Sequence, residues 1–182
     1  MSDTALLVID VQESFRHAPY WHEVDLVPFL DRIQALIDGA IARSIPVLQI
    51  FHMDSDKHFS LSSGFIKTLA PLVIRPDAVF YKHRHSALIG TGLDVWLTRY
   101  GIRRLIISGI RTEQCCETTT RHASDQGWDV DYVTEATLTF AMTHANGQSF
   151  TADEIKTRTE LVLAERFARI TTVAGALAGR SA

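Results

Sequence analysis

The chain has 182 residues, 46% of them hydrophobic, a length that predicts a single domain over residues 1–182 because it is too short for two comfortable cores. A formal net charge of -3, from 18 basic and 21 acidic residues, gives no broad attraction to phosphate groups, so we expect neither nucleic acid nor a membrane surface as a partner. No apolar run approaches the roughly 20 residues that span a bilayer, and the first residues carry no basic stretch typical of a secretion signal, which predicts a cytoplasmic protein.

The first predicted unit is a strand, a helix and a second strand. Residues 5–9 (ALLVI) are all apolar and end at Asp10, a pattern typical of a strand buried on both faces of a parallel sheet. Apolar residues then recur at helical spacing from Leu26 to Ile41, and a second apolar run, residues 47–51, follows Pro46. The alternation continues, with strands expected at 78–81, 105–108, 130–133 and 170–173 and helices at 89–97, 113–126 and 152–167.

Strands that alternate with helices indicate an α/β fold. Parallel strands need crossover connections, and right-handed crossovers place helices on both faces of the sheet. The sequence therefore predicts three layers, with helices on both sides of a doubly wound, mostly parallel sheet of about six strands. Residues 52–75 and 134–150 are rich in polar and small residues and are predicted to be lids or binding loops.

Candidate functional residues stand where the predicted strands end, because an open parallel sheet binds its ligands beyond the carboxyl ends of its strands. The residues in those positions are Asp10 and Gln12 after the first strand, His52 after the second, Lys82 after the third and, after the fourth, the turn 109–112 that leads to Cys115. We expect Asp10, Lys82 and Cys115 to converge at one edge of the sheet if strands one, three and four are near one another.

Cys115 is the candidate nucleophile. It lies in the first turn of a predicted helix, where unpaired amides and the positive end of the helix dipole favour a reactive thiolate, and Thr112 is placed as the helix cap. Asp10 is suited to accept the thiol proton and Lys82 to hold that carboxylate. Singly, each has an ordinary explanation: a turn-forming aspartate, a solvated lysine and an inert cysteine. Their joint position at strand ends favours the catalytic interpretation.

The chain has two cysteines, Cys115 and Cys116, and adjacent residues rarely reach disulfide geometry. We therefore expect no structural disulfide, and Cys116 should be buried as a small apolar side chain. Two other hypotheses remain open. In one, the two thiols form a redox sensor; in the other, the fold binds a small molecule or a partner without catalysis.

Three stretches resemble the isochorismatase-like cysteine hydrolases: LLVIDVQESF, FYKHRHSAL and GIRTEQCCETTTRHASDQGWDVDYVTEAT. The resemblance covers nearly the whole chain and implies a Rossmann-like hydrolase fold. It implies a catalytic triad of Asp10, Lys82 and Cys115. It also implies a non-proline cis peptide between Ile110 and Arg111, which would turn backbone amides of Ile110, Arg111 and Cys115 toward the substrate as an oxyanion hole.

The resemblance also implies a reaction. Members that retain the cysteine hydrolyse a carbon–nitrogen bond of an amide, ureido or carbamoyl compound through a covalent thioester, releasing ammonia or an amine. We therefore expect a small-molecule substrate and no cofactor. As in other members, we expect the chain to assemble into dimers, tetramers or larger homo-oligomers.

Candidate substrate contacts are Gln12, Phe15, His52, Arg84 and Arg111. Because a guanidinium can hold a carboxylate through two hydrogen bonds, Arg84 and Arg111 favour an acidic substrate. A surface ion pair or a contact between subunits is the alternative for both arginines.

The segment 52–58 carries residue types that bind metals. If it were extended, His52, Asp54, Asp56 and His58 would share one face and could bind zinc or manganese. Their spacing differs from the Asp-x-His pair of family nicotinamidases, so we predict a solvated polar loop and no metal site.

Overall fold

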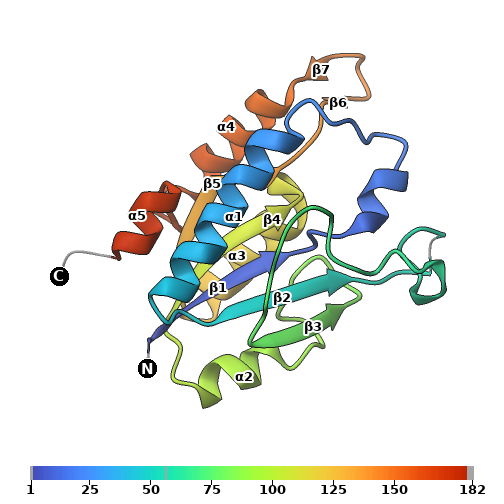
Figure 1. Cartoon of the computed structure of the whole chain (residues 1–182). Helices are drawn as coiled ribbons and strands as arrows, with labels where there is room; N and C mark the ends of the chain where they lie inside the picture. The colour runs from blue at the N-terminus through green and yellow to red at the C-terminus, as the bar shows by residue number, and fades with distance from the viewer. Residues whose placement is uncertain (1, 56, 180–182) are drawn as a thin grey trace.

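The computed structural model describes residues 2–55 and 57–179 and contains a central sheet of six strands (Figure 1). The strands are β1 (Thr4–Ile9), β2 (Val47–His52), β3 (Ala78–Lys82), β4 (Arg104–Ile110), β5 (Asp129–Leu138) and β8 (Arg169–Ile170). Their order across the sheet is β3-β2-β1-β4-β5-β8, and neighbouring strands are parallel. The predicted α/β class and parallel sheet are therefore confirmed.

Helices cover both faces of this sheet (Figure 1). One face carries α1 (Leu26–Ala42) and α5 (Val173–Ala178), and the other carries α2 (Leu93–Arg99), α3 (Glu117–Asp125) and α4 (Ala152–Leu163). Along β1, Leu6 and Val8 join the core under α1, whereas Leu7 and Ile9 join the core on the opposite face, as the period of two in a strand requires. None of the helices in the described ranges is long and apolar enough to cross a membrane.

The remaining regular elements are short. They are the 3₁₀ helices η1 (Glu13–His17) and η2 (Leu61–Ser63), the π turn η3 (Thr112–Cys116), and a hairpin of β6 (Met142–Thr143) and β7 (Ser149–Phe150). The predicted loop at 52–75 is confirmed as a long connection, since η2 is the regular element between β2 and β3 in its described part.

Two predicted boundaries are wrong in the middle of the chain. The helix expected at 89–97 begins at Leu93, because Gly90 and Gly92 have φ values of 70° and 75°, which a right-handed helix excludes. The strand expected at 130–133 continues to Leu138. Within this buried extension, the hydroxyl of Thr137 is satisfied, since it donates to the carbonyl of Thr134 at 2.8 Å.

The predicted C-terminal boundaries are also wrong. Helix α4 ends at Leu163 instead of residue 167, and the expected strand at 170–173 is the shorter β8. Val173 instead begins α5, where the Thr172 hydroxyl accepts a hydrogen bond from the Gly175 amide at 3.1 Å. A threonine cap before a run of small residues is a helix signal that outweighs the apolar pattern at this point.

The direction of strand addition reverses between β1 and β4. From β1 the chain adds β2 and β3 on one side of the sheet and then crosses to add β4 on the other. The carboxyl ends of β1 and β4 therefore lie side by side, with Ile9 opposite Gly109. Such a reversal leaves a crevice in which open α/β sheets bind ligands.

Gly109 makes the close approach of these two strands possible. Its φ is 129°, and a Cβ placed on it would come within 1.9 Å of the carbonyl oxygen of Ile9. That oxygen belongs to the backbone next to Asp10, so it cannot move aside without displacing the edge of the sheet.

We expect Gly109→Ala to destabilise the protein by about 3 kcal/mol or more, because the added methyl group meets fixed backbone at a φ that alanine disfavours. Denaturant unfolding measures this free energy. Gly64→Ala is the matched control, since Gly64 has a φ of 73° and open space around its Cβ position, so only about 1 kcal/mol should be lost. Equal losses in the two variants would contradict the steric explanation.

Candidate active site

Asp10 follows β1 directly, beside the point where the strand order of the sheet reverses. Its amide donates to the Ile50 carbonyl of β2 at 2.9 Å, and its φ of 54° turns the chain sharply at the strand end. The side chain is fully buried, with Oδ2 2.8 Å from Nζ of the equally buried Lys82. Burying two charges is unfavourable unless they are paired closely, so this contact explains how both charges are kept inside.

Lys82 ends β3 and reaches past β2 to the centre of the site. Its Nζ forms an ion pair with Asp10 Oδ2 at 2.8 Å and hydrogen bonds with His52 Nδ1 at 3.0 Å, the Arg84 carbonyl at 3.1 Å and Cys115 Sγ at 3.2 Å. These three hydrogen bonds engage the three protons of an ammonium group. Burial lowers the Lys82 pKa, but the Asp10 carboxylate and Cys115 offset this and hold that pKa above its ordinary value, which keeps the ammonium charged.

His52 is a neutral neighbour of this ammonium. Burial, and then the positive charge of Lys82, lower the His52 pKa, so its ring is uncharged at neutral pH. Its Nδ1 lies 3.0 Å from Nζ and acts as an acceptor, which places the ring proton on Nε2. The structure thus makes His52 a contact of Lys82.

Cys115 lies in η3, the π turn between β4 and α3, and is 6% exposed. Burial raises the pKa of this thiol well above its ordinary value, the Asp10 carboxylate raises it further, and Lys82 opposes both. The predicted stabilised thiolate is therefore wrong: the resting group is a thiol. The neighbouring Cys116 is fully buried in the core, and both cysteines are free.

The turn before Cys115 has the predicted cis peptide between Ile110 and Arg111. The predicted cap is wrong, because neither η3 nor α3 has a side-chain cap. The Thr112 hydroxyl instead lies 2.7 Å from that of Thr137 on β5. This contact ties the turn to the unpredicted extension of β5.

Arg111 is buried in a cluster that sequence reasoning missed. Its Nη2 lies 2.9 Å from Glu113 Oε1, and each side chain is 8% exposed. The guanidinium carbon lies 4.7 Å from the ring centroid of Tyr20 and 5.7 Å from that of Phe140. The opposite charge of Glu113, two residues after Arg111, was the available signal for this pairing.

The other candidate substrate contacts lie as follows. The Gln12 side chain donates through Nε2 to Ser14 Oγ at 2.9 Å and to the His52 carbonyl at 3.0 Å, and its Oε1 accepts from the His52 backbone amide at 2.8 Å. Its hydrogen-bonding groups are therefore engaged with protein. Phe15 is buried in the core and packs edge-on against Phe59 at 5.1 Å. Arg84 is exposed, and its Nη1 donates to the His83 carbonyl.

The segment after β2 does not form the extended metal-binding face considered above. The Asp54 amide donates to the Phe59 carbonyl at 2.8 Å, so the chain turns back after His52, and Asp56 lies outside the described residues. Among the described residues, the possible ligand group is Asp10, His52 and Cys115. The Lys82 ammonium contacts all three, so this donor set is organised around a lysine and does not fit a resident divalent metal.

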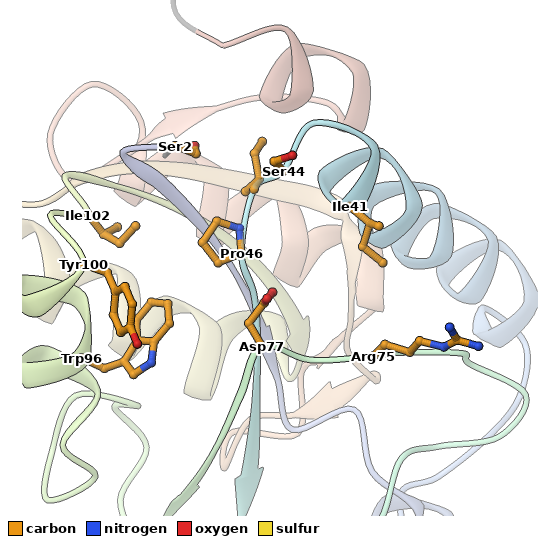
Figure 2. A pocket seen from close by; sticks show the side chains of 10 residues that line it. Ser2, Ile41, Ser44, Pro46, Arg75, Asp77, Trp96, Tyr100 and Ile102 are labelled. Atoms are coloured by element: carbon orange, nitrogen blue, oxygen red, sulfur yellow. The ribbon is translucent and has the colours of Figure 1, made fainter.

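A groove of about 580 Å³ lies at the amino ends of the strands, opposite the ends that carry Asp10 and Lys82 (Figure 2). Its wall includes Pro46 and Asp77, which precede β2 and β3, and Ile102, which precedes β4. Trp96 and Tyr100 stand together at one side of it. Because these residues lie at the amino ends of strands, the groove is separate from the site around Cys115.

Comparisons with known proteins place the chain among relatives. A family model described as "Isochorismatase domain" matches residues 4–174. The chain is 31% identical to Nicotinamidase 3 of Arabidopsis thaliana over 152 residues, which cover 75% of this chain and 73% of that protein. It is 29% identical over 172 residues to the isochorismatase family protein YrdC of Bacillus subtilis, covering 92% and 91% of the two chains.

The fold is also similar to the crystal structure of an isochorismatase-family protein from Chromobacterium violaceum, with a TM-score of 0.87 and 27% sequence identity. The match covers 97% of this chain and 93% of that chain. The fold defines an α/β protein with an open, parallel sheet whose strand order reverses between β1 and β4. The family match is more specific: the chain belongs to the isochorismatase family of hydrolases. The resemblance seen in the sequence is therefore confirmed.

Proposed function

We propose that the chain is a cysteine-dependent amidohydrolase that cleaves a carbon–nitrogen bond of a small substrate through a thioester on Cys115. The contact of Lys82 Nζ with both Asp10 Oδ2 at 2.8 Å and Cys115 Sγ at 3.2 Å carries this proposal. A thiol, a carboxylate and an ammonium group in contact supply the nucleophile, the base and the countercharge that covalent hydrolysis requires.

The first half of the proposed reaction forms the thioester. The thiol proton of Cys115 passes to Asp10, whose Oδ1 has no hydrogen-bond partner among the described residues. The sulfur attacks the carbonyl carbon of the substrate, and an electron pair moves to the carbonyl oxygen. When this adduct collapses, the carbon–nitrogen bond breaks and the proton on Asp10 goes to the nitrogen, so ammonia or an amine leaves.

The second half releases the acid. Water gives a proton to the Asp10 carboxylate and attacks the thioester carbon, and the carbon–sulfur bond breaks. The proton then returns from Asp10 to the Cys115 sulfur. Because both groups already contact Lys82, an N–H of Lys82 can turn from one to the other as negative charge moves between them.

The turn around the cis peptide is the proposed oxyanion site. The cis peptide joins Ile110 to Arg111. Backbone amides of Arg111 and Cys115 would donate to the substrate oxygen that becomes negative during attack. Fixed donors of this kind stabilise the transition state more than the ground state.

Two observations favour a carbon–nitrogen bond over the vinyl ether of isochorismate. The chain has the cysteine that covalent amide hydrolysis needs, in contact with a base and a cation. Its relative Nicotinamidase 3, by name, acts on an amide.

A substrate panel tests the proposal. We expect the purified protein to release ammonia from at least one small amide, urea or carbamoyl compound, measured by a coupled ammonia assay. Failure on a broad panel, together with tight binding of one of its members, would instead favour a small-molecule-binding protein without catalysis.

A further inference from the structure

Two pairs of opposite charges lie around Cys115. Asp10 pairs with Lys82, and both side chains are fully buried. Arg111 pairs with Glu113, and both are about nine-tenths buried. Within each pair the charges cancel, so these four buried side chains together carry no net charge.

The second pair belongs to the same space as the thiol. Tyr20 packs against the Arg111 guanidinium at 4.7 Å, and its pKa responds to Arg111, to Cys115 and to Glu113, although burial raises it most. The pair also belongs to the turn that carries Cys115: Glu113 lies in η3 with Cys115, and the Cys116 amide donates to the Arg111 carbonyl at 3.3 Å. A substrate held at Cys115 would therefore lie near the Arg111 guanidinium, whose charge Glu113 balances.

Two other basic groups near Lys82, His52 and Arg84, supply no free buried cation. His52 is neutral, because burial and Lys82 lower its pKa. Arg84 is a cation, but its side chain is exposed, so water screens its charge.

One donor in the cluster is unused. Arg111 Nε is buried and has no hydrogen-bond partner among the described residues. A single N–H next to the Glu113 carboxylate suits a neutral acceptor such as a carbonyl oxygen or a ring nitrogen. A carboxylate there would face Glu113 and lack the free guanidinium edge that two-pronged binding needs.

We infer that the substrate of this site is an uncharged amide or urea, because both buried cations beside Cys115 are already paired with carboxylates. This inference rests on the proposed amidohydrolase function. It replaces the acidic substrate favoured by Arg84 and Arg111 in the sequence. A carboxylate-bearing substrate would be buried without a counterion, which is strongly unfavourable.

The test compares 4-acetylbenzamide with 4-carboxybenzamide and 4-oxopentanamide with succinamate, pairs of similar size that differ in charge. We expect kcat/KM to be at least about 100-fold higher for the neutral member of each hydrolysed pair. Equal or better hydrolysis of the anionic members would overturn the inference and leave the amidohydrolase proposal standing. Hydrolysis of neither kind, in these pairs and across the wider panel, would overturn both.

A charge variant tests the cause in the same assay. Glu113→Gln removes the carboxylate that neutralises Arg111, so the neutral-to-anionic ratio of kcat/KM should fall at least about tenfold, through a lower KM for the carboxylated amide. Glu165→Gln, at an exposed position after α4, removes the same charge and should leave the ratio unchanged. If Glu113→Gln folds and its neutral-to-anionic ratio of kcat/KM is unchanged, the role of the Arg111–Glu113 pair is overturned. If this variant does not fold, the ratio measured for the wild type decides whether the substrate is uncharged.

Discussion

Cys115→Ala is expected to lower ammonia release by at least about 1,000-fold while the protein stays folded. The loss is large because the substitution removes the atom that would form the covalent bond, and the remaining groups offer only binding and polarisation. Folding should change little, since alanine differs from cysteine by one sulfur atom at a site that is 6% exposed. Steady-state kinetics and a thermal unfolding curve measure the two effects.

Cys116→Ala is the matched control for this experiment. It removes the same atom one residue away, from a side chain that is fully buried in the core and outside the contacts of Lys82. We expect a loss of about 1 kcal/mol in stability from the small cavity, with turnover retained. Full turnover by Cys115→Ala, or equal losses of turnover in both variants, would refute the nucleophile assignment.

Asp10→Asn should move two properties of the protein in opposite directions. Turnover should fall by at least about 100-fold, because the amide cannot accept the thiol proton. The thiol itself should become more reactive toward iodoacetamide, because the Asp10 carboxylate is one cause of the raised Cys115 pKa, and its removal increases the thiolate fraction at a given pH. The rate of alkylation as a function of pH, followed by mass spectrometry, measures this.

The direction of the change in alkylation rate shows whether the Asp10 carboxylate acts on the thiol as a base or has only a structural role. In the wild type, burial and Asp10 raise the Cys115 pKa, so alkylation of Cys115 should be slow near neutral pH. Its rate should continue to rise with pH at values where the rate for free cysteine has already reached its plateau. This replaces the rapid alkylation that a stabilised thiolate would show. Slower alkylation of Asp10→Asn across the whole pH range would contradict the proposed electrostatics.

The mistaken thiolate prediction shows which physical effect dominates at Cys115. A helix terminus contributes about 0.3–1 kcal/mol to a nearby charge. Full burial can shift a pKa by about 3–5 units, at 1.36 kcal/mol per unit. The sequence predicts that Cys115 lies at the start of a helix, whereas its 6% exposure depends on tertiary packing. The sequence therefore indicated the weaker effect, the helix dipole, and not the stronger effect, burial.

The edge of the sheet that carries the site was predictable from the sequence. Apolar runs that end abruptly at Asp10 and Lys82 mark strand ends, and parallel strands place these ends at one edge. Strand order was not predictable in the same way: β3 lies two positions from β1. Lys82 reaches Asp10 because its long side chain crosses the end of β2, where it also meets His52.

The pairing of Arg111 with Glu113 was the least predictable feature of the site. A lone Arg111 in the turn favoured an acidic substrate, but the structure pairs it with Glu113. Thr139 then donates to the second oxygen of Glu113 at 2.6 Å, from a stretch that had been assigned to a loop. The partner of a buried arginine depends on contacts of this kind, which single-residue patterns do not encode.

The covalent step is tested most directly by intact-mass spectrometry of the enzyme quenched with acid during turnover of a good amide substrate. We expect a population heavier than the free enzyme by the mass of the acyl group, located on the peptide that contains Cys115, removed by hydroxylamine and absent in Cys115→Ala. Turnover without any such adduct, and undiminished in Cys115→Ala, would contradict covalent hydrolysis at this site.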